Sequence, residues 1–409
     1  MSHHSENSNE VLVVGAGPVG LTAALALRAE GLPVTVLEAG AEDRVRPGSR
    51  GIFYHRQTLE FWENMRAGLG WEIARAGLAW RTKRTFWGEH QVYERTYPPP
   101  PPDVLPHSTN LGQIDVERIL LRHCKEAGVR FAWNQEVVGA ATDPQGLRLT
   151  TRDGREWRAP YAIACDGARS PVRKSLGIEL EGPRIEDAFV IVDVADDPES
   201  PMPPERRYYY EHPLVQKRNI LLVPFRNGIR ADIQLRRGDD PNDFNSPEGV
   251  KRWLGRVLPE KYTERVTWIS TYQFLQVVAD SFTDAHRRVL LAGEAAHLFA
   301  PFGARGLNSG VPDAVAAAKA IKRALQTPDP ALARAAIEKA ATERREAALY
   351  NRNASNLALE HMRARDWATR LRRRGAALLS RYGARAGAYL DSAPFGPRAA
   401  AKGNADTIY

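Results

Sequence analysis

The chain has 409 residues, of which 43% are hydrophobic and 26% are charged. This is an ordinary soluble composition, long enough for two domains or one large interleaved unit. No run of about 18 apolar residues occurs, which excludes a transmembrane helix, and the polar start lacks the apolar core of a signal peptide. Cys124 and Cys165 are the only cysteines and match no metal-binding spacing, so we expect no metal site and a reducing, cytoplasmic location.

The chain is basic, with a formal net charge of +8 and a pI near 9.5. Such a charge attracts anionic small molecules, including phosphorylated cofactors. Arginine is spread along the chain, with one local concentration in RARDWATRLRRRG (363–375), which is typical of the solvated face of a C-terminal helix. We therefore expect no nucleic-acid partner and no membrane partner. Nucleic-acid binding through the basic tail is the minor alternative.

Residues 9–39 have the pattern of a dinucleotide-binding unit. After a lead-in that we expect to be disordered (1–9), VLVV (11–14) predicts a buried strand, a helix follows to about Glu30, and a second strand (34–37) ends at Glu38. Glycines permit the tight turn, the approach of backbone to a pyrophosphate, and close packing of helix on strand. A carboxylate at Glu38 can accept both ribose hydroxyls of an adenosine and would repel a 2′-phosphate, which favours FAD or NAD over NADP. The predicted binding residues are Gly15, Gly17, Pro18, Val19, Gly20, Glu38 and Ala39.

Two later segments belong with this unit. YAIACDGARSPVRKSLGI (161–178) predicts a strand, a turn at Asp166-Gly167 and a helix that opens with Ser-Pro. GEAAHLFAPFGARGLNSGVPDA (293–314) predicts a glycine-rich loop and an alanine-rich helix that begins near Ser309. Backbone N–H groups in such a loop and the N-terminus of the helix both favour negative charge. The loop is therefore predicted to meet an anion or a developing anion.

The region from about residue 181 to 282 has a different character. Its segments alternate in polarity or are rich in aromatic residues, as antiparallel strands are. They are EDAFVIVDVAD, RRYYYEHP, RNILLVPFRNGIRADIQLRR and RVTWISTYQFLQVVADSF. The chain after residue 347 is predicted to be helical and basic.

Three motifs together resemble one enzyme family. GAGPVG with Glu38, the Asp166-Gly167 turn and the Gly293-Glu294 loop stand in the order and spacing of the single-component FAD-dependent aromatic hydroxylases of the para-hydroxybenzoate hydroxylase type, over roughly residues 10–345. The resemblance implies an α/β fold, in which a Rossmann-like FAD-binding domain is interleaved with a β-sheet substrate domain and followed by a C-terminal helical segment. We assign residues 10–80, 105–180 and 281–345 to the FAD-binding domain, 81–104 and 181–280 to the substrate domain, and 346–409 to the C-terminal segment.

The resemblance also implies contacts with FAD. Arg50 resembles an arginine that touches the cofactor, Gln113 a glutamine near the ribityl chain, and Asp166 an acid that organises the nucleotide site. Glu294 stands where the family has an aspartate that binds a ribityl hydroxyl, and Pro301 resembles a proline beside the flavin ring. The helix after the loop would stabilise the charge of reduced flavin at N1 and O2. The residues matched in the loop are Gly293, Glu294, Pro301, Gly306, Leu307 and Asn308.

The activity implied by the resemblance is hydroxylation of a phenol or related aromatic by an FAD monooxygenase. NADH or NADPH would reduce FAD, and O₂ would give a C4a-hydroperoxide that transfers oxygen to the ring. A homodimer is allowed. Alternatives are a flavin-dependent dehydrogenase, reductase or epoxidase on the same fold, and a flavin-binding protein without turnover.

The family's substrate cavity has a sheet as its floor, for which the predicted strands of residues 181–280 are the match. Candidates to face the flavin are Tyr210, His212, Arg230, Gln234 and Gln273. Alternation along a strand does not say which face points inward, so these candidates stay open and no catalytic base is named. His297 lies inside the glycine-rich motif and is expected to be structural.

Overall fold

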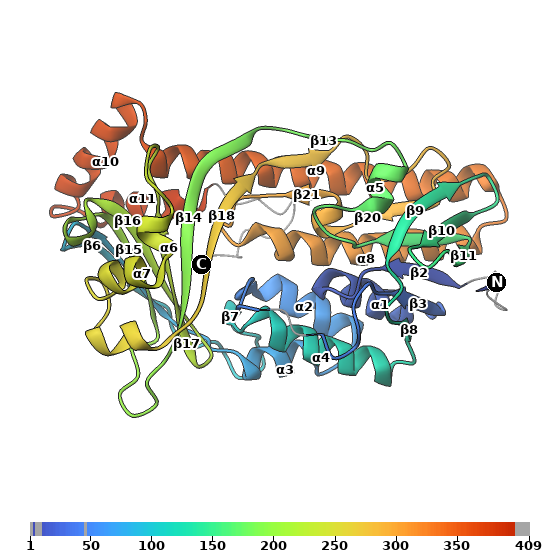
Figure 1. Ribbon diagram of the computed structural model, residues 1–409, viewed down its shortest axis with the longest axis horizontal. Coiled ribbons are helices and arrows are strands. Elements are labelled where there is room, and N and C mark those ends of the chain that lie inside the picture. Colours follow the sequence, from blue (N-terminus) through green and yellow to red (C-terminus); the bar gives the residue numbers. More distant parts are fainter. Residues whose placement is uncertain (1–2, 5–9, 45–46, 397–409) are drawn as a thin grey trace.

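The computed structural model describes residues 3–4, 10–44 and 47–396, which form two sheet-based parts connected by long helices (Figure 1). The two sheets at the centre of these parts differ in kind, since one is parallel and the other is mainly antiparallel. The predicted α/β fold is confirmed.

The first part contains a parallel sheet with the strand order β20-β12-β2-β3-β8. Its strands are β2 (Val11–Val14), β3 (Val34–Leu37), β8 (Arg130–Ala132), β12 (Tyr161–Ala164) and β20 (Val289–Leu291). Three helices, α1 (Pro18–Ala29), α4 (Gln113–Glu126) and α8 (Arg305–Gln326), pack beside one another, with α1 between the other two. The first predicted strand, helix and second strand are thus present at the predicted places.

Smaller elements complete this part. A four-stranded sheet contains β1 (His3–His4), β9 (Val137–Thr142), β10 (Leu147–Thr151) and β11 (Glu156–Ala159), and a two-stranded sheet contains β4 (Phe53–His55) and β7 (Ser108–Asn110). The shorter helices are α2 (Arg56–Met65), α3 (Leu69–Ala76) and α5 (Pro171–Ser175). Strand β1 lies in the lead-in that was expected to be disordered, where backbone pairing with β11 orders His3–His4. Residues 1–2 and 5–9 of that lead-in lie outside the described residues.

The second part is a seven-stranded sheet with the order β18-β14-β17-β16-β15-β5-β6. Its strands are β5 (Thr82–Trp87), β6 (His90–Thr96), β14 (Arg184–Ala195), β15 (Glu205–His212), β16 (Arg218–Phe225), β17 (Gly228–Gln234) and β18 (Val266–Leu275). The helices α6 (Asn242–Asn245) and α7 (Pro247–Leu254) belong to this part. Ile220, Ala231 and Ile233 of the sheet share one apolar cluster with Val250 and Trp253 of α7. The sheet therefore has an outer face toward α7 and an inner face on its other side.

A three-stranded sheet is formed by short strands that lie between the segments of the two parts along the chain. Long helices come after it in the sequence. Its strands are β13 (Leu180–Glu181), β19 (Val277–Ala279) and β21 (His297–Leu298), and four short 3₁₀ turns are η1 (Pro213–Val215), η2 (Glu260–Glu264), η3 (Gly293–Ala295) and η4 (Ala393–Phe395). Helix α9 (Pro330–Arg363) runs along both parts in Figure 1, so the predicted boundary at residue 345 falls inside a continuous helix. Helices α10 (Trp367–Leu379) and α11 (Ala384–Ser392) follow.

The arginine-rich stretch of α10 is only partly a solvated face. Arg373 is buried, its guanidinium lies over the rings of Trp87 and Tyr210, and it donates to the carbonyls of His361 and Met362 at the end of α9. Trp367 and Leu371 are exposed instead. Among the described helices, none is both long enough and apolar enough to cross a membrane.

Candidate functional site

At two positions of the first glycine turn, only glycine fits. Gly15 has a φ of 96°, and a Cβ there would lie 2.6 Å from the carbonyl oxygen of Cys165. A Cβ on Gly20 would lie 1.9 Å from the carbonyl oxygen of Gly15. Helix α1 then begins after Gly17 without a side-chain cap and without an acid in its first turn. Its first N–H groups therefore have no intrahelical acceptor and no competing negative charge, which fits a pyrophosphate.

Glu38 directly follows β3 and binds the backbone of the glycine turn. Its buried carboxylate accepts from the N–H of Ala16 at 2.6 Å and from the N–H of Gly40 at 3.1 Å, and it lies 3.4 Å from Arg44 Nε. Arg44 also donates to the carbonyl of Ala16 at 2.7 Å and lies over Trp133. Sequence reasoning missed Arg44, since one arginine among several in that loop carries no distinguishing signal.

The three predicted motifs lie in one place. Gly15 is against the backbone of Cys165 and Asp166, and the side chain of Val19 fills the space beside both Gly293 and Gly310. A Cβ on Gly310 would lie 2.6 Å from Val19. The buried Arg173 donates to the carbonyl of Ala295 at 3.1 Å and so joins the second motif to the third. The structure thus brings together segments that are separated by about 280 residues in the sequence.

Asp166 presents an unused acceptor. Its Oδ2 accepts from the N–H of Val172 at 3.1 Å, whereas its Oδ1 is shielded from solvent and has no hydrogen-bond partner among the described residues. Burial raises the pKa of this carboxyl, against the opposing effect of hydrogen bonds from Ser170 and Val172 and the charge of Arg173. A buried orphan oxygen is costly, and a donor group on a bound nucleotide would satisfy it.

The glycine-rich loop after β20 is fixed by a buried carboxylate. Asp313 accepts from the N–H of Gly293 at 3.2 Å, pairs with His297 Nε2 at 2.7 Å, and pairs with Arg344 Nε at 2.7 Å. Although burial of Asp313 favours its neutral form, the charges and hydrogen bonds of Arg344 and His297 hold its pKa below the ordinary value. His297 is 1% exposed and serves this cluster, in agreement with the structural role expected for it. The side chains of Glu294 and Pro301 are exposed on the same loop.

The helix after this loop begins earlier than predicted. Helix α8 starts at Arg305 rather than near Ser309, because Ala304 adopts a left-handed φ of 52° and turns the chain directly into the helix. Gly306 and Leu307 therefore lie in the first turn, where helix geometry leaves N–H groups without an intrahelical acceptor. The helix has no side-chain cap and no acid in its first turn. This end fits a negatively charged group, as the sequence predicted.

Three other predicted contacts, Asn308, Arg50 and Gln113, have different roles in the structure. The Asn308 side chain accepts from His55 N and Thr58 Oγ1 and donates to the carbonyls of Phe53 and Ala304. Because its amide is used to attach β4 and α2 to α8, Asn308 is a framework residue through its side chain.

Arg50 lies on the loop before β4, and Gln113 is the first residue of the neighbouring helix α4. Gln113 accepts from the N–H of Gly51 at 3.2 Å and donates to Glu117 at 2.8 Å. Arg50, beside Gly51, is exposed and has a left-handed φ of 52°, a backbone conformation that costs energy for an arginine and is concentrated at ligand sites.

The inner face of the seven-stranded sheet meets two of these loops. Arg230 and Asp193 form an ion pair at 3.1 Å, and both bind Ser49, the residue before Arg50. Further along the same face, the ring of Phe189 on β14 lies 5.4 Å from that of Phe302 in the glycine-rich loop. The inner face is thus in contact with the loop at 47–51 and the loop at 300–303.

Register decides which predicted candidates share this face. Residues paired across an antiparallel sheet have side chains on the same side. Arg230 pairs with Asp193, Asp232 with Ile191, and Gln234 with Phe189, so Arg230, Asp232 and Gln234 all point inward. Asn219 donates to Gln234 Oε1 at 2.7 Å. Sequence reasoning selected Arg230 and Gln234 but missed Asp232, which the same alternation would have included.

The other three candidates do not face the loops. Tyr210 is fully buried, donates to the carbonyl of Leu390 at 2.6 Å and contacts His361, so it anchors the C-terminal helices. His212 lies against Tyr209, and Gln273 is exposed and pairs with Ala188 of the outer cluster. Sequence alone could not exclude them, since their contacts come from α9, α11 and strand pairing.

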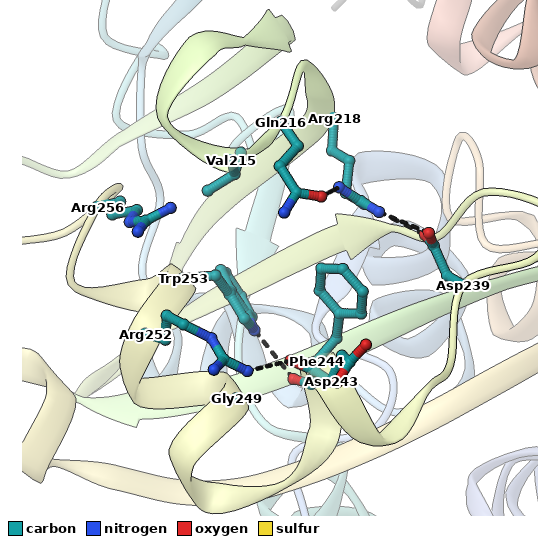
Figure 2. A pocket seen from close by; sticks show the side chains of 10 residues that line it. All are labelled: Val215, Gln216, Arg218, Asp239, Asp243, Phe244, Gly249, Arg252, Trp253 and Arg256. Carbon is teal, nitrogen blue, oxygen red and sulfur yellow. Dashed lines mark hydrogen bonds and ion pairs between the residues drawn. The ribbon is translucent and has the colours of Figure 1, made fainter.

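A pocket in the described part of the chain lies away from these loops. It has about 410 Å³ and lies on the outer side of the sheet between β16, α6 and α7 (Figure 2). Three of its charged groups already have partners, since Arg218 binds Asp239 at 2.6 Å and Arg252 donates to the backbone carbonyl of Asp243 at 3.2 Å. Since it opens on the face opposite Arg230 and Asp232, we do not place the reaction there. No group of three His, Cys, Asp or Glu residues in the described ranges could hold a metal ion.

Comparison with known proteins agrees with this geometry. The family model described as "FAD binding domain" matches residues 8–349. A 3-(3-hydroxy-phenyl)propionate/3-hydroxycinnamic acid hydroxylase of Mycobacterium avium (strain 104) is 27% identical over 331 residues, covering 76% of this chain and 54% of that protein. The para-nitrophenol 4-monooxygenase of Pseudomonas sp. (strain WBC-3) is 29% identical over 330 residues, covering 77% of this chain and 78% of that protein.

The chain therefore spans about half the length of the first of these relatives. Among solved structures, p-nitrophenol 4-monooxygenase from Pseudomonas putida DLL-E4 superposes with a TM-score of 0.75 at 24% identity, covering 95% of this chain and 98% of that one. The likeness in fold extends over both parts of the molecule.

Proposed function

Since its family model matches residues 8–349, the chain belongs to the FAD-binding domain family, and from this premise we propose that it is an FAD-dependent monooxygenase. It hydroxylates a phenolic or related aromatic substrate and consumes NADH or NADPH and O₂. When bound, FAD supplies the acceptance of hydride from NAD(P)H and the activation of O₂. The reaction class rests on the kinds of enzyme to which the chain is similar.

The residues of this chain supply binding, orientation and electrostatics. The turn at Gly15–Gly20 and Glu38 would hold the adenosine diphosphate half, and Asp166 would offer its orphan oxygen to the nucleotide. The loop from Gly293 to Ala304 and the first turn of α8 would take the flavin half, where the helix N-terminus favours negative charge. Arg50 and Gln113 would line the opposite loop.

One observation supports the proposal most strongly. A second structural unit, the inner face of the seven-stranded sheet, contacts both flavin loops through Ser49 and through Phe302. It offers aromatic and aliphatic groups beside a few polar ones, which is how small-molecule sites are usually lined. A substrate held on this face would lie between the two loops.

The test is substrate-dependent oxygenation by the purified flavoprotein. A panel of phenols should include at least one that speeds NADH or NADPH consumption and gives a product heavier by one oxygen, derived from isotopically labelled O₂. A dehydrogenase or reductase would consume nicotinamide cofactor without incorporating labelled oxygen, and an epoxidase would act on an alkene. A yellow protein inactive with the whole panel would contradict the proposal.

We further propose a cytoplasmic location and allow a homodimer. Both cysteines are unpaired, which suits a reducing compartment. Sedimentation of the holoenzyme would measure its oligomeric state.

A further inference from the structure

Asp232 lies at the centre of the inner face. On β17 it stands between Arg230 and Gln234, and the register places it in one row with Ile191 of β14 and Leu221 of β16. Arg230 contacts the loop at Ser49, and the row of Gln234 carries Phe189, which contacts Phe302. The carboxyl of Asp232 therefore occupies the middle of a surface whose two ends are fixed to the two flavin loops.

This carboxyl lacks the partners that its neighbours have. Asp193 uses both oxygens, on Arg230 and on the N–H of Ser49. Asp232 Oδ1 is shielded from water and meets no hydrogen-bond donor among the described residues. A buried acceptor without a partner costs about 1–3 kcal/mol, which a purely structural aspartate would avoid. The side chain as a whole is half-buried.

The groups around Asp232 leave its charge state adjustable. Arg230 on its own strand favours the carboxylate, whereas Asp193 on β14 disfavours it. The row neighbours on β14 and β16 are apolar, Ser270 of β18 is neutral, and burial raises the pKa of Tyr208 on β15 and keeps that phenol neutral. Arg50 is the charged residue of the loop that contacts Arg230, and from the C-terminal helices the charge of Arg373 acts on Tyr208. Burial is the largest effect and raises the pKa of Asp232 to about 7.

We infer that Asp232 is the acceptor for the hydroxyl group of a phenolic substrate and takes its proton. In this step the phenol O–H bond breaks, a new O–H bond forms on the carboxyl of Asp232, and the electron pair of the broken bond stays on the phenolate oxygen. The neutral acid then donates a hydrogen bond to that oxygen. No electron is transferred in the step, and a phenolate ring is the better nucleophile. The inference rests on the proposed function and adds the residue that the sequence could not name.

The first test is proton linkage in binding, measured without turnover. The holoenzyme is titrated with 4-nitrophenol, whose anion is yellow, in the absence of NAD(P)H. Above the pH at which both the free probe and Asp232 are ionised, the bound pair must take up one proton to form its shared hydrogen bond. The dissociation constant of the wild type should then rise tenfold for each pH unit. In Asp232→Asn the anion binds without that proton, so the constant should be flat.

Matched variants separate this role from a structural one. Asp232→Glu keeps the carboxyl and should keep the slope. Asp240→Asn makes the same chemical change at an exposed position just after β17 and should behave as wild type. Because an unpartnered carboxylate is removed, Asp232→Asn should also hold FAD and melt no lower than wild type above pH 7. A variant that loses FAD or fails to fold would make the carboxyl structural and would overturn the inference.

Turnover gives a second, independent readout. With 3-(3-hydroxyphenyl)propionate, a weakly acidic phenol, kcat/KM of Asp232→Asn should fall about 10²–10⁴-fold, as on loss of a general base. With 4-nitrophenol, which ionises in water by itself, the fall should be much smaller. Equal pH slopes and equal losses on the two phenols, in a wild type that hydroxylates them, would refute the role of Asp232. A wild type that hydroxylates no phenol would instead refute the proposed function.

Discussion

Glu38 is the residue through which the cofactor prediction can be tested most directly. Replacing it by Ala would remove the proposed acceptor for two ribose hydroxyls and leaves the N–H of Ala16, now bonded at 2.6 Å, without its partner. We expect FAD binding to weaken by about 1.5–3 kcal/mol, the usual loss for a hydrogen bond to a charged group. A titration of apoprotein with FAD, followed by flavin fluorescence, measures the change. Glu42→Ala, which breaks an exposed ion pair with Lys125 of α4, is the matched control.

An FAD dissociation constant that is the same in Glu38→Ala and in the control would mean that the ribose lies elsewhere. Glu38→Gln adds detail, because its amide oxygen can still accept from one N–H while the charge is lost. Intermediate affinity in this variant would separate the effect of charge from that of the turn.

Glu294 is the position at which the sequence departs from the family pattern. Its side chain is exposed, and the loop around it is held by Asp313 through Gly293 and His297, without any contribution from Glu294 itself. Glu294→Ala should therefore fold normally but lose FAD affinity or flavin positioning, whereas Glu294→Asp should retain much of both. FAD titration and the rate of NAD(P)H oxidation without product measure the two effects. Wild-type values for Ala in both assays would show that Glu294 does not meet the cofactor.

At the scale of elements, sequence reasoning worked where the signal was local. The strands at 11–14 and 34–37 and the glycine turn follow from a short pattern, and each is present. The start of α8 was placed four residues late, since nothing in the sequence shows that Ala304 takes a left-handed φ of 52°. The inner face of β17 could not be chosen before its register with β14 and β16 was known, because alternation is the same on both faces.

The packing of the C-terminal helices could not be predicted either, because their buried contacts are with strands far away in the sequence. Arg373 stands in a run of arginines that is expected to be solvated, but it is buried against Trp87 and Tyr210 of the seven-stranded sheet. On α10 the apolar Trp367 and Leu371 are exposed whereas the charged Arg373 is buried, which reverses the usual pattern. Helix periodicity marks two faces, and only the tertiary contacts decide which of them is covered.

The attachment of these helices predicts a pH dependence of stability. His361 of α9 is 8% exposed and contacts the hydroxyl of Tyr210 at 2.8 Å. Burial, helped by the charges of Arg373 and Arg372, lowers the pKa of His361 to about 3. The unfolded chain binds a proton at this residue below about pH 6.5, whereas the folded chain does not until about pH 3. The free energy of unfolding should therefore fall as pH falls between these values.

The slope from this residue should approach about 1.4 kcal/mol per pH unit. Urea unfolding at several pH values in this range measures it, and His361→Asn should have a shallower slope than wild type. His90→Asn, at an exposed position at the start of β6, should leave the slope unchanged. Parallel slopes for His361→Asn and wild type would mean that His361 is protonated in the folded protein.

For the molecule as a whole, the two parts are coupled by a small polar cluster. Asp193 of β14 binds Arg230 of β17 and the N–H of Ser49, which places a residue of the seven-stranded sheet in control of the loop that carries Arg50. Asp193 is 2% exposed, so the pair is screened little by solvent. This arrangement predicts that the position of the loop that carries Arg50 depends on the seven-stranded sheet, although the two lie in different parts of the fold.

Replacing Asp193 by Ala should therefore weaken FAD binding as well as stability. Arg230 would be left as an unpaired, nearly buried charge, and removal of one partner from such a pair costs about 3–5 kcal/mol. Urea unfolding should show that loss, while FAD titration should show a higher dissociation constant because the N–H of Ser49 loses its acceptor. Glu94→Ala breaks a half-exposed pair with Arg84 in the same sheet and should cost less than about 1 kcal/mol, with no effect on FAD. A double-mutant cycle of Asp193→Ala with Ser49→Ala measures the coupling that passes through Arg230, which binds both side chains, while the N–H of Ser49 is kept. Residues of one network give interaction energies of about 0.5–3 kcal/mol. Additive effects, or lower stability with unchanged FAD binding, would mean that the cluster holds the sheet alone and does not position the loop.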